Sequence, residues 1–159
     1  MKKKKLITGI LFSLLLAFSF TGCKEKESET LNDFKPPVSF KWEGNYVDEE
    51  GTITLTIEKK GGKSYACTVN VVDEEITHID TYEFTATEDD YGLSYEDGVH
   101  TSFEIPDYEK DPEASTVATE TYTDGTGSIY YLEDRLYWSD DKNDAGNGFV
   151  FQKVEESEE

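Results

Sequence analysis

Two histidines supply the imidazole groups with which this 159-residue chain could hold a metal ion or move a proton. His78 is followed two residues later by Asp80, and His100 four residues later by Glu104, so each pair would share one face of a strand. Imidazole and carboxylate are metal ligands, and each pair is therefore a candidate metal site. However, with 35 acidic residues in the chain, a carboxylate near each histidine is expected by chance.

No known catalytic motif organises these histidines. The chain contains no G-x-S-x-G nucleophile motif, no H-E-x-x-H zinc motif and no glycine-rich phosphate loop. We therefore predict that the protein is not an enzyme and that it has no cofactor.

A polar loop near the C-terminus offers oxygen ligands to a hard cation. Residues 140–147 read Asp-Asp-Lys-Asn-Asp-Ala-Gly-Asn, and Asp141, Asn143 and Asp144 are the candidate calcium ligands. The alternating pattern of a calcium loop fails at Ala145 and Gln152, where further oxygen ligands are needed. A solvated hairpin loop is the preferred interpretation, and calcium binding is the alternative.

The two tryptophans, Trp42 and Trp138, are candidate ligand-binding residues because an indole ring in a cavity can stack on a ligand. They lie near the two ends of the patterned part of the chain, so they could also pack together in a core. We favour the core role and keep ligand binding as the alternative.

The N-terminus has the organisation of an export signal. Four lysines at positions 2–5 precede an apolar run at 6–20, which is shorter than the roughly 20 residues that a spanning helix needs. The run ends in Phe20-Thr21-Gly22-Cys23, which resembles the lipobox of bacterial lipoproteins. The resemblance implies cleavage before Cys23, palmitate or a similar lipid on its thiol, and anchoring at the extracytoplasmic face of the cell membrane. An ordinary signal peptide with a chance cysteine, or an uncleaved anchor, is the alternative.

The remaining sequence divides into three parts. After the signal peptide at 1–22, residues 23–38 form the lipidated cysteine and a flexible, charged linker that ends in two prolines. Residues 39–154 form the domain, and 155–159 form an acidic tail. The signal holds four of the 15 basic residues and none of the 35 acidic ones, so the mature chain has a formal charge of −24. This charge excludes nucleic acid as a partner, and it leaves either a merely solvated surface or attraction to a basic protein or to cations.

From residue 39 onward, apolar and polar residues alternate, as they do in antiparallel strands with one wet face. We predict an all-β domain, an up-and-down meander of 8–10 strands closed into a small barrel, with a two-sheet β-sandwich as the alternative. Cys67 alternates with polar neighbours and is expected to be a small buried hydrophobe. The predicted strands include 52–57, 65–71, 82–86, 99–105, 117–122, 128–132, 136–138 and 149–151, and the predicted turns include 49–51, 60–62, 96–98, 124–127 and 146–148.

Three short motifs resemble the small lipoproteins that carry a lipocalin-like, or calycin, barrel. They are Lys-Trp-Glu-Gly-Asn-Tyr at 41–46, Leu-Tyr-Trp-Ser-Asp at 136–140 and Gly-Phe-Val-Phe at 148–151. The resemblance implies a non-catalytic binding module for a small apolar or amphipathic ligand, or for a sugar. The alternative is an acidic protein-interaction module, such as an inhibitor of a cationic enzyme.

Overall fold

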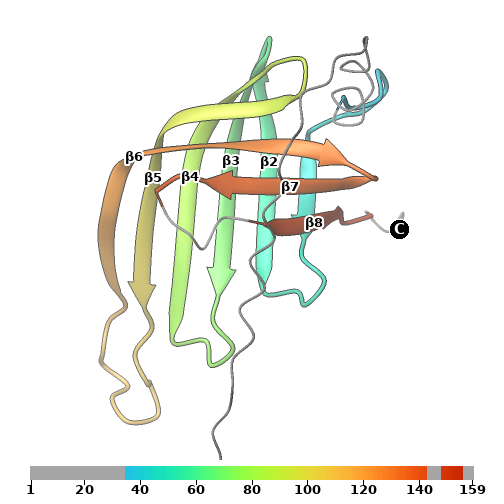
Figure 1. Ribbon diagram of the computed structural model, residues 1–159. Helices are drawn as coiled ribbons and strands as arrows, with labels where there is room; N and C mark the ends of the chain where they lie inside the picture. The colour runs from blue at the N-terminus through green and yellow to red at the C-terminus, as the bar shows by residue number, and fades with distance from the viewer. Residues whose placement is uncertain (1–34, 143–147, 156–159) are drawn as a thin grey trace, which may run out of the picture.

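The computed structural model describes residues 35–142 and 148–155, and in these ranges eight antiparallel strands follow one another around a barrel (Figure 1). Each strand pairs with the next one in the chain, as expected for short connections. The strands are β1 (Gly44–Val47), β2 (Ile53–Gly61), β3 (Ser64–Val72), β4 (His78–Glu88), β5 (Gly92–Glu104), β6 (Val117–Leu132), β7 (Arg135–Asp140) and β8 (Phe149–Lys153).

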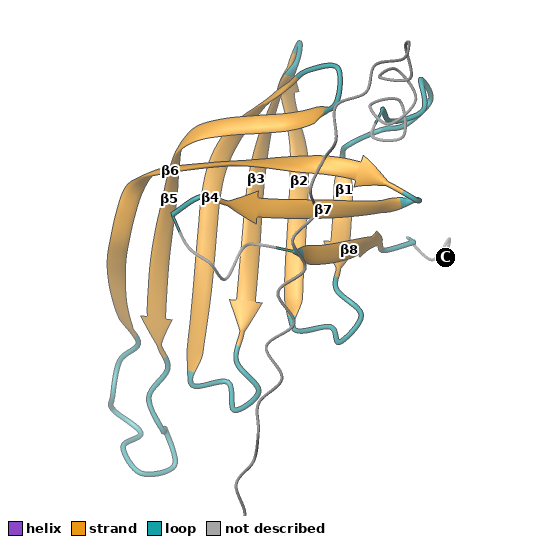
Figure 2. Cartoon of the chain, viewed as in Figure 1, coloured by secondary structure: helices purple, strands orange, loops and turns teal. Residues whose placement is uncertain are grey.

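The barrel closes where the last strand returns to the first. Tyr46 and Val47 of β1 lie opposite Lys153 and Gln152 of β8, so no strand of the sheet is left with a free edge. The predicted meander and barrel are thereby confirmed, with a strand number at the lower end of the predicted range. Figure 2 shows strands and loops but no helix in the described residues. Within these residues, no helix is long and apolar enough to cross a membrane.

Two predicted turns were wrong because the chain continues through them as strand. Residues 96–98 lie inside β5 and residues 124–127 lie inside β6, where Gly98 and Gly125 are opposite each other and the register shifts. A Cβ atom on Gly98 would lie 2.9 Å from the Tyr95 ring, and one on Gly125 would lie 2.7 Å from the Tyr122 ring. These glycines therefore allow close packing at β-bulges, and β5 and β6 both bend sharply there (Figure 1).

The bulge in β5 also changes which side chains face inward. Leu93 and Tyr95 are buried before the bulge, whereas His100 is buried after it and Val99 is only partly buried. The extra residue moves the alternation by one position, so the odd-numbered residues after it turn to the outer side. An uninterrupted period of two could not predict that His100 points into the barrel.

The interior of the barrel is packed with side chains. Seventeen hydrophobic residues form one buried cluster to which every strand contributes, and Leu55, Val69, Ile129 and Phe151 are fully covered. On β4, buried Tyr82, Phe84 and Ala86 alternate with exposed residues, as the period of two predicts.

Cys67 belongs to this cluster and is 2% exposed. Burial raises the pKa of its thiol to about 12. At pH 8 the thiolate fraction should therefore be roughly 10³-fold below that of a free cysteine. We expect the folded protein, studied with Cys23→Ala so that one thiol remains, to resist Ellman's reagent until urea unfolds the barrel. Rapid labelling under native conditions would contradict the buried position.

Candidate binding surface

Both tryptophans lie in the core. Trp42 is 2% exposed and Trp138 is 1% exposed. Trp42 meets the ring of Phe40 edge-on at 5.0 Å, while Trp138 packs against Tyr82 at 4.9 Å between ring centroids. The two indoles therefore stabilise different aromatic groups of one core. This arrangement supports the core role that the sequence favoured.

A buried carboxylate that the sequence analysis missed lies beside Trp138. Asp140 is 2% exposed, and it accepts hydrogen bonds from the Tyr95 hydroxyl at 2.8 Å and the Tyr122 hydroxyl at 3.0 Å. The backbone N–H of Lys142 donates a third, at 2.9 Å. Burial, followed by the hydrogen bond to Asp140, raises the pKa of Tyr95 and of Tyr122, so both hydroxyls stay protonated and keep donating. The network ties β5, β6 and β7 together.

His100 lies in a second polar group, in which its carboxylate partner is Asp80 and not the Glu104 of the candidate pair. Its Nε2 is 3.1 Å from Oδ1 of Asp80 on β4, and its Nδ1 is in hydrogen-bond contact with Oγ1 of Thr121 on β6. The Tyr82 ring stacks on the imidazole, with 4.3 Å between centroids. His100 thus joins three strands, a role that depends on the inward turn caused by the bulge in β5.

His78 is exposed. Its neighbours are not Asp80, the other member of its candidate pair, but two residues of the preceding loop. Its Nδ1 lies 3.0 Å from Oγ1 of Thr77, and Asp73 is the nearby carboxylate at 3.9 Å. Across the described part of the chain, no group of three or more His, Cys, Asp or Glu side chains could hold a metal ion.

The candidate calcium loop is described only at its start. Asp141 is exposed, and its Oδ2 accepts a hydrogen bond from Oγ1 of Thr126 at 3.0 Å. Asn143 and Asp144 lie outside the described residues, as does the lipidation residue Cys23. Calcium binding and lipidation therefore remain predictions.

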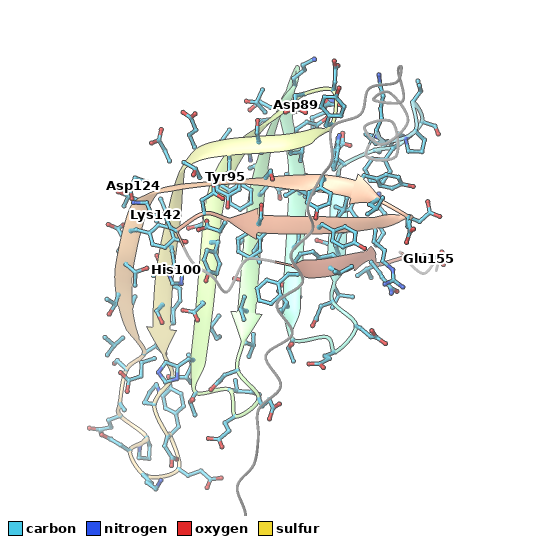
Figure 3. All side chains as sticks on the ribbon, viewed as in Figure 1. Asp89, Tyr95, His100, Asp124, Lys142 and Glu155 are labelled. Atoms are coloured by element: carbon cyan, nitrogen blue, oxygen red, sulfur yellow. The ribbon has the colours of Figure 1, made fainter. Side chains whose placement is uncertain are left out.

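A hollow of about 810 Å³ lies on the outer side of β4–β6, at the bulges. Among the described residues, its lining carries three carboxylates and no lysine or arginine, and the nearby Lys142 is paired with Asp124, with 2.6 Å between Nζ and Oδ2 (Figure 3). Such a lining suits the cationic group of a partner. The lining residues are Thr85, Thr87, Ser94, Tyr95, Glu96, Asp97, Thr126, Gly127 and Asp141.

Comparison with known proteins gives no match: no family model, no curated protein and no solved structure matches this chain. The eight-stranded antiparallel barrel is compatible with a lipocalin-like architecture. Function is therefore inferred from the geometry and charge of the chain itself.

Proposed function

We propose that this protein is a membrane-tethered, non-catalytic module that binds a basic protein through its acidic outer surface. The observation that carries the proposal is the outer hollow at the bulges, whose described lining contains Glu96, Asp97 and Asp141 and no lysine or arginine. A lysine or arginine side chain of a partner would find carboxylates there, together with the hydroxyl groups of threonine and serine residues.

The overall charge supports a partner of opposite sign. A formal charge of −24 after removal of residues 1–22 produces a field that attracts basic proteins and accelerates their encounter. Because exposed charges are screened over about 8–10 Å at physiological salt, the attraction should weaken as salt is added.

The packing of the interior favours this partner over an enclosed apolar ligand. Tyrosine, phenylalanine and tryptophan side chains that could line a ligand cavity are instead buried against one another, as in the stack of Phe84 on Tyr95 at 3.8 Å. Binding at the outer surface requires no change in this core.

The test is the affinity of the domain for a lysozyme of net positive charge, measured by calorimetry at two salt concentrations. We expect binding in roughly the micromolar range at low salt, at least about tenfold weaker at 0.3 M salt. Glu96→Gln with Asp97→Asn should weaken binding about fivefold. The matched pair Glu49→Gln and Glu50→Gln removes the same charge from an exposed turn and should have a smaller effect. Absence of any binding at low salt would refute the proposed function.

The tether is tested separately. In a bacterial host, the wild-type chain should incorporate labelled palmitate and sediment with the membrane, because the lipobox-like sequence supplies the Cys23 thiol. Cys23→Ala should abolish both. Equal labelling of the variant would remove the proposed lipid anchor and leave the barrel's binding role unaffected.

A further inference from the structure

The loop between β3 and β4 presents an apolar side chain in a strained conformation. Ile76 has a φ of 55° and is 62% exposed. A β-branched residue at positive φ is a real outlier, because its side chain crowds the backbone. Neither burial nor packing of the side chain explains why isoleucine stands at this position.

The loop around Ile76 is fixed by one carboxylate. Oδ1 of Asp73 accepts the backbone N–H groups of Thr77 at 2.7 Å and His78 at 2.9 Å, and its Oδ2 accepts the Thr77 hydroxyl at 2.6 Å. The N–H of Ile76 donates to the Asp73 carbonyl at 3.0 Å. These hydrogen bonds hold the pKa of Asp73 below its usual range, so the carboxylate remains charged at neutral pH. The surrounding hydrogen bonds thus impose the strained backbone, a situation found at ligand-binding positions.

A hollow of about 490 Å³ lies between this loop and the end of β5. The N–H of Ile105 donates to the Thr77 carbonyl at 2.8 Å, which fixes the two walls relative to each other. Ile76, Ile105 and Pro106 supply apolar surface. Glu75 and Glu104 supply negative charge around it, whereas the third carboxylate of the lining, Asp107, is paired with Lys110 at 2.6 Å between Oδ2 and Nζ.

This end of the barrel faces away from the point where the N-terminal segment enters. In the meander, the connections β1–β2, β3–β4 and β5–β6 share one end, and residues 35–43 lie at the other end with the β2–β3 and β4–β5 connections (Figure 1). The Ile76 hollow therefore lies at the end of the barrel opposite residues 35–43.

We infer that the hollow beside Ile76 is a docking site for a cationic amphipathic segment of a protein partner. The inference rests on the proposed function in taking the partner to be basic. The apolar wall receives an apolar side chain of that segment, and the carboxylates of Glu75 and Glu104 pair with the lysines or arginines that flank it. The hydrogen bonds to Asp73 hold Ile76 in a conformation that exposes its side chain to the partner.

The test uses the full chain in neutral detergent and two peptide probes, an amphipathic Lys/Leu peptide and an oligolysine of equal charge. Wild type should bind the amphipathic peptide about tenfold more tightly at physiological salt, because only this peptide gains apolar burial. Ile76→Gly should abolish that preference and raise the melting temperature by about 2–4 °C, since glycine accepts the positive φ without strain. Tyr91→Ala removes an exposed side chain of the opposite end and should change neither quantity.

A second variant tests the carboxylates without touching the strained residue. Glu75→Gln with Glu104→Gln should weaken binding of the amphipathic peptide about fivefold. Unchanged preference in Ile76→Gly, or unchanged affinity in the glutamine variant, would overturn the docking site while leaving lysozyme binding, and with it the proposed function, intact. If wild type binds neither peptide nor lysozyme at low salt, the proposed function fails and the docking site fails with it.

Discussion

Replacement of Asp140 by alanine is expected to destabilise the barrel by about 2–4 kcal/mol, because it removes the carboxylate that accepts from the buried Tyr95 hydroxyl and from the partly buried Tyr122. Asp140 is 2% exposed, and the hydroxyls of Tyr95 and Tyr122 both donate to its carboxylate. In the variant, the Tyr95 hydroxyl would keep only the longer bond to the Ser139 carbonyl at 3.3 Å, and the Tyr122 hydroxyl would lose the Asp140 carboxylate. The loss should therefore approach the upper part of the range known for single substitutions.

The measurement is the free energy of unfolding in urea, followed by tryptophan fluorescence. Asp141→Ala is the matched control, because Asp141 is the exposed neighbour of the same type and should change stability by less than about 0.5 kcal/mol. Tyr122→Phe removes one donor and leaves the Tyr95 bond, so we expect a loss of about 1–2 kcal/mol. Equal stability of Asp140→Ala and Asp141→Ala would show that the carboxylate is not part of a buried network.

Truncation of Trp138 to alanine is expected to remove about 3–5 kcal/mol, because a large cavity would open in the centre of the core. The indole is 1% exposed and packs against Tyr82, Phe84 and Phe149, with centroid distances of 4.9, 6.4 and 6.0 Å. Its Nε1–H also donates to the Tyr95 hydroxyl at 3.1 Å. Trp138→Phe would retain part of the ring packing and should be less harmful.

The same urea titration checks this expectation, with Trp42 as the fluorescence reporter. Tyr108→Ala is the control, since Tyr108 is 48% exposed and its loss should be nearly neutral. Because Trp138 and Asp140 both contact Tyr95, their effects should not add, and the double variant should lose less than the sum of the single losses. Full additivity would argue against one connected network.

The barrel could be predicted because its strands carry a regular period of two. Residues 53–57 and 82–86 alternate strictly, and in the structure they place their apolar members in one core. Consecutive hairpins with glycine turns, such as the one at Gly61 and Gly62, made pairing of successive strands the simplest topology. The outer hollow, by contrast, is formed by residues of β4, β5 and β6 and by Asp141 after β7, and their juxtaposition depends on the register of the strands.

Three local features could not be derived from residue types. Gly98 and Gly125 resemble turn residues, but they serve close packing at bulges inside long strands. Conversely, the turn between β6 and β7 contains no glycine, although its two residues, Glu133 and Asp134, adopt positive φ values of 51° and 63°. Asp140 belongs to an acidic run in the sequence, and only the fold shows which of those carboxylates is buried. For Gly98, Gly125 and Asp140 the decisive factor is how β5, β6 and β7 pack together, whereas the β6–β7 turn depends on the backbone of its own two residues.

The short first strand determines how a tethered barrel would respond to mechanical force. β1 contributes four residues, which pair with β2 along their length and with β8 at Tyr46 and Val47 only. If the lipid holds the N-terminus and a partner pulls at the opposite end, tension runs along β1 and not across it. All of its hydrogen bonds are then loaded together in shear, so they must break together and cannot open one after another. Under such a load a strand of four residues would have to shear from both neighbours at once, and its release would open the barrel at the β1–β8 seam.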